Sequence, residues 1–544
     1  MTLHESTMTT GTGVKAQSWR SSGRRPPALL LFLAIAIATI SLLPVAYLLI
    51  REGLNFERLQ HLLGSPTTIP LIRNTVQLAF WVTLSSVVLG VSLAVLVVCT
   101  DLPGRRIWMV LFTLPLGIPA FVSTYTWVAA GYELAPRSTF IYGLRGAVLI
   151  LTLSLFPYVY LPTVAALRGL DASQEGVARA LGRRPLMAFV EVTLPQLRRA
   201  ISSGALIIAL HMLAEYGALE LLRYRTLTTA IVQRATVLGS LDSARALSIV
   251  LTFGALFLLI GDQLLFRNSA SPTRVGSGVN QTRVPWNLGK SMPFFVLLAA
   301  SFIVLSLGVP LYAMIKGLYG VVVGHAAVDG AALAGALWTT SRYSLATAAV
   351  ITLAALPISL LVTRYPRRCV YLIERSAWIA HSLPGVVVSL GLVFFAVRWL
   401  HPFYQTGSLL VIGYAILYLP IAVGAQRVGI GNAAVQYDEV SRSLGRSSMA
   451  TFLTVTLPLA LPGIVAGIML VMLNVAKELT MTLLLRPTGS QTLATKLWTT
   501  TNGEVLDFTA AAPYAITIIA ITAIPTILLI RTSLSPSAQR RRGN

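Results

Sequence analysis

Four charged residues lie at matched positions inside long apolar stretches of this chain. Glu478 follows Glu215 by 263 residues, and Arg486 follows Arg223 by the same 263 residues. An intramembrane carboxylate that faces lipid costs about 2–3 kcal/mol or more, so these side chains must face the protein interior or water. Their types and spacing therefore suit a polar path across a membrane.

A helix that begins near residue 201 would carry Glu215 about 21 Å into a hydrocarbon layer of roughly 30 Å, and Arg223 about 12 Å further. One interpretation is that Glu215 and Glu478 line a translocation path on opposite sides of a pseudo-twofold axis. We expect the other candidates on that path to be His211, Tyr216, Arg223, Lys477 and Arg486. The alternative is that the two glutamates are structural anchors, with Glu478 neutralising Lys477 or an arginine. Both interpretations stay open.

A polar segment that precedes each glutamate is repeated at the same spacing. From Val177 to Ile201, eleven of twenty-five residues are identical to the residue 263 positions later. Each copy begins with a carboxylate and continues with an arginine, a glycine, a phenylalanine and a proline. The candidate residues are Glu175, Arg179, Gly182, Phe189 and Pro195 in the first copy, and Glu439, Arg442, Gly445, Phe452 and Pro458 in the second.

The repeated pattern predicts a helix, a glycine stop and a second short helix. The glutamate suits the positive end of the first helix dipole. Gly182 and Gly445 can adopt the left-handed conformation that ends a helix. The second helix would present the phenylalanine, and the proline would end it before the next apolar stretch. We interpret the segment as a docking surface; the alternative is an amphipathic connector on the membrane surface.

The composition is that of an integral membrane protein. The chain is 55% hydrophobic and 11% charged, with a mean hydropathy of +0.75, whereas a soluble domain is about a quarter charged. We therefore expect an all-α membrane protein with about twelve transmembrane helices in two tandem six-helix repeats. Apolar runs long enough to span a bilayer lie near 28–50, 76–99, 107–130, 146–167, 201–222, 245–266, 292–316, 342–363, 376–398, 407–428, 463–485 and 510–530.

Basic clusters follow every second run, which places both termini and both repeated segments in the cytoplasm. An even number of spans in each half makes the repeats parallel. The expected organisation is a cytoplasmic N-terminal tail, a first transmembrane half, a flexible linker rich in Ser, Gly and Pro, a second half and a basic tail. These parts cover residues 1–27, 28–266, 267–291, 292–531 and 532–544.

Several other functions are disfavoured. The net charge of +23 could indicate nucleic acid, but the basic residues fall in short clusters beside apolar runs, as in positive-inside loops. The chain shows no pairing of nucleophile with base and no metal-ligand cluster, so we do not expect an enzyme. Gly289-Lys290-Ser291 resembles the end of a phosphate loop, but Val284 stands where that motif requires glycine. We expect no cofactor in this chain, and we expect a separate subunit to bind ATP and Mg²⁺.

The repeated segment resembles the EAA motif of the permeases of ABC importers, in which Glu-Ala-Ala precedes a glycine and a later Leu-Pro. In that family the segment is a coupling helix that sits in a cleft of the ATPase subunit. The resemblance implies a type I importer fold, one ATPase copy for each segment and an extracytoplasmic solute-binding protein. The second copy matches well. The first departs, because Gly176 occupies the usual glutamate position and Glu175 lies one residue earlier.

The residues from Lys477 to Pro487, followed by Gln491 to Thr495, resemble fused permeases of the ferric-iron type. That resemblance implies Fe(III) as the solute, with Glu215 and Glu478 able to contact it transiently, and no stable metal site. Relatives that carry thiamine, phosphonates, sulfate or polyamines share the architecture and stay as alternatives. A twelve-helix secondary transporter is the rival class, but such transporters lack the repeated segment. The expected location is the bacterial cytoplasmic membrane, where the chain would also contact lipid.

Overall fold

The computed structural model describes residues 26–52, 60, 64–134, 136–170, 173–237, 239–266, 285–327, 329–502 and 507–534. Within these ranges the chain is helical, and one isolated β-bridge joins Thr100 to Trp286. The predicted tails lie almost wholly outside the described residues, and so does the linker up to residue 284.

The first half begins with two long helices and ends with another. Its elements are α1 (Ala28–Glu52), α3 (Thr68–Cys99), α4 (Arg105–Leu111), η1 (Leu114–Gly117), α5 (Ala120–Leu134), α6 (Gly143–Leu155), α7 (Pro157–Gly169), α8 (Ser173–Ala180), α9 (Pro185–Ala188), η2 (Phe189–Thr193), α10 (Leu194–Gln196), α11 (Arg198–Ala214), α12 (Gly217–Leu221), α13 (Leu227–Thr236) and α14 (Leu241–Phe266).

The second half repeats this order with some helices fused. Its elements are η3 (Gly289–Ser291), α15 (Met292–Ile303), η4 (Val304–Gly308), α16 (Val309–Val322), α17 (Gly330–Arg364), α18 (Arg368–His381), α19 (Gly385–Trp399), η5 (His401–Phe403), α20 (Gly407–Asn432), α21 (Val435–Ser443), α22 (Ser448–Thr451), η6 (Phe452–Thr456), α23 (Leu457–Ala476), α24 (Thr480–Leu485), α25 (Leu493–Thr501) and α26 (Phe508–Leu534).

Each predicted span has a counterpart among the described residues. Eight helices are long and apolar enough to cross a membrane, and three bent helix pairs raise the number to eleven. The twelfth predicted span corresponds to α26, whose first part, Phe508–Ala523, is a shorter apolar helix. An all-helical membrane fold with two repeats is therefore confirmed, and three of the spans are bent helix pairs.

The third span of each half bends sharply. The first bends by 93° between Gly117 and Ala120, and the second bends by 99° between His381 and Gly385. Pro119 and Pro384 lie at these bends. Because proline has no backbone N–H and clashes with the preceding turn, a helix cannot continue regularly through it.

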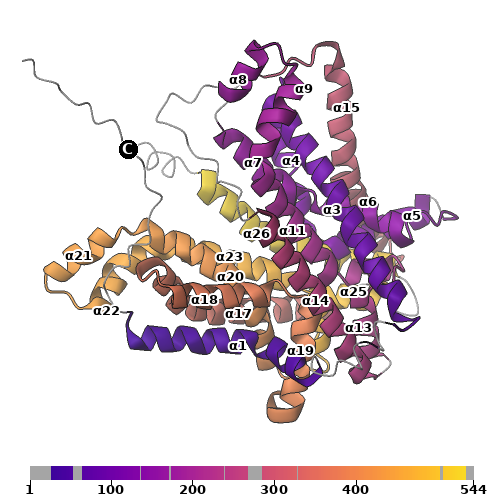
Figure 1. Ribbon diagram of the computed structural model, residues 1–544. Coiled ribbons are helices and arrows are strands. Elements are labelled where there is room, and N and C mark those ends of the chain that lie inside the picture. Colours follow the sequence, from indigo (N-terminus) through magenta and orange to yellow (C-terminus); the bar gives the residue numbers. More distant parts are fainter. Residues whose placement is uncertain are drawn as a thin grey trace, which may run out of the picture.

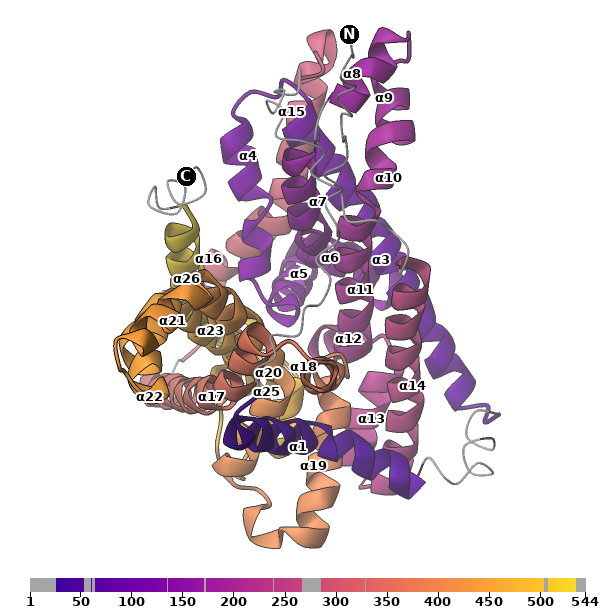
Figure 2. The same ribbon diagram turned by 60° about the vertical axis from the view of Figure 1, so that its left-hand side comes forward.

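The two halves exchange their first helices. α1 packs against α17, α18 and α19 of the second half. In return α16 packs against α5, and Ala299 of α15 is buried in the same cluster as Leu93 of α3. Figures 1 and 2 show α1 lying along the second half and α15 standing beside the first. The two halves predicted on either side of residues 267–291 therefore interlock in the packed structure.

Candidate functional site

The two repeated segments fold as predicted into a helix, a glycine turn and a second short helix. We name residues 173–196 the first loop and residues 435–458 the second loop. Gly182 has φ +88° and Gly445 has φ +83°, both in the left-handed region. A Cβ atom at either position would meet no atom within 4 Å, so backbone conformation and not space demands glycine. Figure 1 shows α8 and α21 at the outer tips of the two halves.

The arginine after each glycine holds the corner of its loop closed. Arg183 Nε lies 3.5 Å from Glu191 Oε2 in the first loop. At the matching positions of the second loop, Arg446 Nη1 donates a hydrogen bond of 3.0 Å to Thr454 Oγ1. The bond type differs, but each bond joins the glycine turn to the second helix of its own loop.

A buried carboxylate anchors the first helix of each loop. Glu175 is 4% exposed and accepts a hydrogen bond from Thr193 Oγ1 at 2.9 Å. Asp438 is 7% exposed and accepts one from Thr456 Oγ1 at 2.7 Å. Both pairs are related by the offset of 263. The counterpart of Glu175 is therefore Asp438, which was not among the candidate residues.

Glu439 lies on the exposed surface of α21, and Gly176 is its counterpart in the first loop. Glu439 was chosen as a candidate because it fits the family motif. The structure shows instead that Asp438 makes the same hydrogen bond as Glu175. The buried acids position the loops, and of the two candidate carboxylates Glu175 and Glu439 only Glu439 is exposed.

The phenylalanines of the two loops are buried or half-buried, and the prolines follow them within the second helical segment. Phe189 is buried, so the expectation that the second helix presents it outward is wrong for the first loop; Phe452 is half-buried. Both phenylalanines begin a π-helical turn, η2 or η6, which ends two residues before Pro195 or Pro458. A wider turn accommodates the missing proline N–H. The first segment then bends by 69° before α11, whereas Ser448–Ala476 counts as one span, so Pro458 does not end its helix.

Exposed apolar side chains occupy matching positions in both loops. Leu181 is 80% exposed and its counterpart Leu444 is 75% exposed. The exposed apolar residues that match at the offset of 263 are Val177, Leu181, Leu186 and Val190 in the first loop, and Val440, Leu444, Met449 and Leu453 in the second. Arg179 is half-buried and Arg442 is exposed. Clustered exposed apolar residues with a polar rim are typical of a protein-binding surface.

Sequence reasoning noted the Val177 and Leu181 identities but did not assign them to docking. The sequence did hold a signal for an apolar surface, because Val177 and Leu181 lie one turn apart in an otherwise polar segment.

The intramembrane glutamates lie where the helix breaks. α11 ends at Ala214, and Glu215 has an extended backbone conformation before the short helix α12. Glu215 Oε1 accepts a hydrogen bond from the Ala218 N–H at 3.0 Å, and Oε2 lies 3.4 Å from His211 Nε2. The carboxylate therefore caps α12 with one oxygen and contacts an imidazole with the other.

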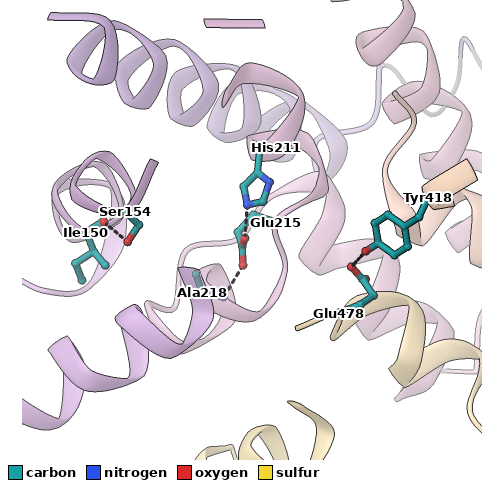
Figure 3. A network of polar contacts seen from close by, with 7 residues as sticks. All are labelled: Ile150, Ser154, His211, Glu215, Ala218, Tyr418 and Glu478. Atoms are coloured by element: carbon teal, nitrogen blue, oxygen red, sulfur yellow. Dashed lines mark hydrogen bonds and ion pairs between the residues drawn. The ribbon is translucent and has the colours of Figure 1, made fainter. Parts of the chain in front are cut away.

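Glu478 repeats the cap with a different second contact. Its Oε1 accepts a hydrogen bond from the Met481 N–H at 3.0 Å, which is the matching position to Ala218. Its Oε2 accepts one from the Tyr418 hydroxyl at 2.7 Å. Lys477 directly follows α23, and among the described residues no ion pair joins it to Glu478. Figure 3 shows the His211–Glu215 pair and the Tyr418–Glu478 pair at neighbouring breaks.

The two breaks meet where the halves come together. A Cβ atom on Gly217 would lie 2.6 Å from Leu479 Cδ2 of the other half. Tyr216 is buried, with its ring centroid 5.2 Å from that of Trp498. Tyr158 packs near His211, with ring centroids 6.5 Å apart. Each break thus places a carboxylate at this junction, beside an imidazole in the first half and a phenol in the second.

The arginines lie apart from this group. Arg223 sits in the turn after α12 with φ +53°, and its guanidinium lies 5.2 Å from the Tyr142 ring centroid. Arg486 donates a hydrogen bond of 3.0 Å to the Ser490 carbonyl just after α24. The expected advance of 12 Å beyond Glu215 assumed an unbroken helix, whereas the helix breaks at Glu215. Among the described residues, no group of three or more His, Cys, Asp and Glu side chains is suited to hold a metal ion.

Comparison with known proteins decides the family. The model for the inner membrane component of binding-protein-dependent transport systems matches twice, over residues 86–269 and 355–534. The chain belongs to this family. It is a permease of an ABC importer, a transport subunit that is not itself an enzyme, and it is a multi-pass inner-membrane protein. The two matches also confirm that one membrane unit is present twice.

Individual relatives differ in how much of the permease they match. The chain is 36% identical over 512 residues to the Fe(3+)-transport system permease protein FbpB 2 of Haemophilus influenzae, covering 93% of this chain and 98% of that protein. It is 23% identical over 477 residues to the ferric transport system permease protein FbpB of Actinobacillus pleuropneumoniae, covering 81% and 68%. It is 27% identical over 199 residues to the molybdate/tungstate transport system permease protein WtpB of Pyrococcus furiosus, covering 37% and 78%.

Proposed function

We propose that this permease passes Fe(III) from a solute-binding protein into the cytoplasm. The observation that carries the proposal is the presence of Glu215 and Glu478 at the two helix breaks where the halves meet, with the Tyr418 hydroxyl on Glu478. Carboxylate and phenol oxygens suit a hard cation, and they disfavour an oxyanion such as molybdate. Similarity over 93% and 81% of this chain to two permeases named for ferric transport supports the same solute.

The contact with Fe(III) would be transient. One oxygen of each glutamate is committed to capping the short helix that follows it, which leaves the other oxygen for the solute. In the present arrangement His211 and Tyr418 occupy those second oxygens. Since transport requires release as well as binding, a site with few free ligands that are exchanged for protein partners suits passage better than storage.

Coupling to ATP would use the two loops. The importer family implies an ATPase and a solute-binding protein as partners; we propose two ATPase copies, one for each loop, with ATP and Mg²⁺ bound there. The exposed apolar residues around Leu181 and Leu444 would fill a cleft on each copy. Both loops and both termini would then lie in the cytoplasm.

Uptake of radioactive Fe(III) into proteoliposomes that contain the permease, its ATPase and its solute-binding protein tests the solute. We expect Glu215→Gln and Glu478→Gln to lower uptake strongly while ATPase binding persists, because glutamine can still cap the following helix but carries no charge. Tyr418→Phe should lower uptake moderately. The matched control is Tyr414→Phe, four residues earlier on α20, whose buried hydroxyl bonds Thr482 and not Glu478. Unchanged uptake in both glutamate variants, or transport of molybdate in place of iron, would reject the proposal.

A further inference from the structure

We infer that residues 285–291, here named the linker strut, hold the first loop in position, and that Trp286 is its positioning residue. This inference rests on the proposed role of the loops in ATPase coupling. It adds a function to a segment that the sequence suggested was only a flexible connection. These residues are the part of the linker that the structure describes, and they lead directly into α15.

The strut is attached to the first half by backbone hydrogen bonds just after α3. The Trp286 N–H donates to the Cys99 carbonyl at 2.7 Å, and the Asp101 N–H donates to the Trp286 carbonyl at 3.1 Å. The Leu288 N–H then donates to Asp101 Oδ1 at 3.0 Å. Three bonds over three residues fix the direction of the Trp286 side chain.

That side chain reaches the buried acid of the first loop. Its Nε1–H donates to Glu175 Oε1 at 3.2 Å, while Thr193 occupies Oε2. Its ring packs edge-on against Phe189, with centroids 5.8 Å apart and planes at 84°. Trp286 therefore touches both helices of the first loop at once, through the anchor of α8 and through the residue that begins η2.

The second half performs the same task by a different means. Asp438 pairs there with Arg364, whose Nη2 lies 3.1 Å from Asp438 Oδ2. Arg364 is the counterpart of Asp101 at the offset of 263, so the first half has an acid where the second has the cation. The second half thus uses a guanidinium from its own helix α17, whereas the first half uses an indole N–H from the linker.

The consequence is a mechanical link between the halves. The strut ends with η3 and leads into α15. Ala299 of α15 is buried in the first-half cluster that also contains Phe189. A movement of this second-half helix is therefore transmitted to the first loop through Trp286. The second loop is braced from within its own half by Arg364.

The test compares variants in the reconstituted importer, with Fe(III) transported per ATP hydrolysed as the readout. Trp286→Phe keeps the ring and removes the N–H, and we expect it to lower this ratio several-fold. The matched control is Trp108→Phe on α4, whose N–H donates to the Pro103 carbonyl at 3.0 Å and not to the loop. It should leave the ratio unchanged. Asp101→Arg in the Trp286→Phe background supplies the cation that the second half uses, and it should restore part of the loss.

A photo-crosslinker locates the effect. With exposed Cys369 changed to Ser, the reagent is attached at Val177→Cys or Val440→Cys, on matching faces of the two loops. We expect Trp286→Phe to reduce crosslinking to the ATPase from residue 177 but not from residue 440. Equal coupling and equal crosslinking in Trp286→Phe and the parent overturn the strut. If neither position crosslinks to the ATPase in the parent itself, the proposed function of the loops fails instead.

Discussion

In the first loop, Glu175 accepts hydrogen bonds from Thr193 and Trp286, whereas in the second loop Asp438 accepts one from Thr456 and pairs with Arg364. The backbone of the two loops is the same: a helix, a left-handed glycine, a short helix and a π turn. The source of the brace differs. Duplication thus maintained the shape presented to a partner, while the contacts behind that shape diverged.

The same contrast holds inside the membrane. Both glutamates cap a short helix after a break, and both caps use N–H groups at matching positions. The second oxygen contacts His211 in one half and Tyr418 in the other. The shared contact maintains the fold, and the contact that differs faces the junction where a solute would pass.

The largest expected effect comes from the glycine turns, where the loops are identical. Gly182→Val and Gly445→Val should each nearly abolish ATP-driven uptake, because the left-handed conformation costs an ordinary residue about 1–2 kcal/mol and a β-branched one more. Uptake and co-purification of the ATPase are the measurements. Gly176→Ala is the matched control, since a Cβ atom there meets nothing and its φ is ordinary. A strong defect in only one glycine variant would show that the loops do not act equivalently.

Substitution of the buried acids should distinguish the Trp286 contact of the first loop from the Arg364 contact of the second. Asp438→Asn leaves the largely buried Arg364 without its counter-ion, and breaking a buried pair costs about 3–5 kcal/mol. Glu175→Gln weakens the charged hydrogen bonds from Thr193 and Trp286, at about 1.5–3 kcal/mol. Thermal unfolding of the detergent-solubilised permease should therefore show a larger loss for Asp438→Asn. The opposite order would mean that Arg364 does not depend on this pair.

The exposed leucines test whether the two docking surfaces are equal. Leu181→Ser and Leu444→Ser should each weaken ATPase binding about tenfold, equivalent to about 1.4 kcal/mol, because a buried apolar contact with the partner is lost. Folding should be unaffected, since both side chains are exposed. Glu439→Gln on the rim should have a smaller effect. If Glu439→Gln outweighs Leu444→Ser in a binding titration, the carboxylate and not the apolar surface dominates docking.

The smallest effect is expected at the corner arginines. Arg183 and Glu191 form an exposed ion pair, typically worth about 0–1 kcal/mol and weakened by salt. Arg446 donates to a neutral hydroxyl instead. The stability lost in Arg183→Ala should therefore shrink between low and high salt, while that of Arg446→Ala should change less. Parallel salt dependence in the two variants would contradict this distinction.

The local features of the fold could be predicted because single residues determine them. Gly182 and Gly445 end helices, and the repeat spacing locates the second copy from the first. The breaks at Glu215 and Glu478 could not be predicted, because apolar residues continue on both sides and a continuous apolar run is also what an unbroken span shows. Pro119 and Pro384 were visible in the third spans, but the angle of the bend depends on packing between helices.

Contacts between distant parts of the chain were beyond prediction. The exchange of α1 and α15 between halves depends on surfaces that hydropathy does not distinguish. Trp286 lies in a segment whose composition is typical of a flexible linker, and its contact with Glu175 spans 111 residues. The assignment of Glu439 in place of Asp438 followed the family motif, whereas the hydrogen bond to Thr456 identifies the anchoring acid.

The most direct test of the account is the energy source of Fe(III) uptake in proteoliposomes that contain the permease, its ATPase and its solute-binding protein. We predict that uptake requires ATP on the side of the membrane where the ATPase is bound. Uptake should persist when an ionophore collapses the proton gradient, and it should be lost in Gly445→Val. Uptake that follows the proton gradient and ignores ATP would contradict the account.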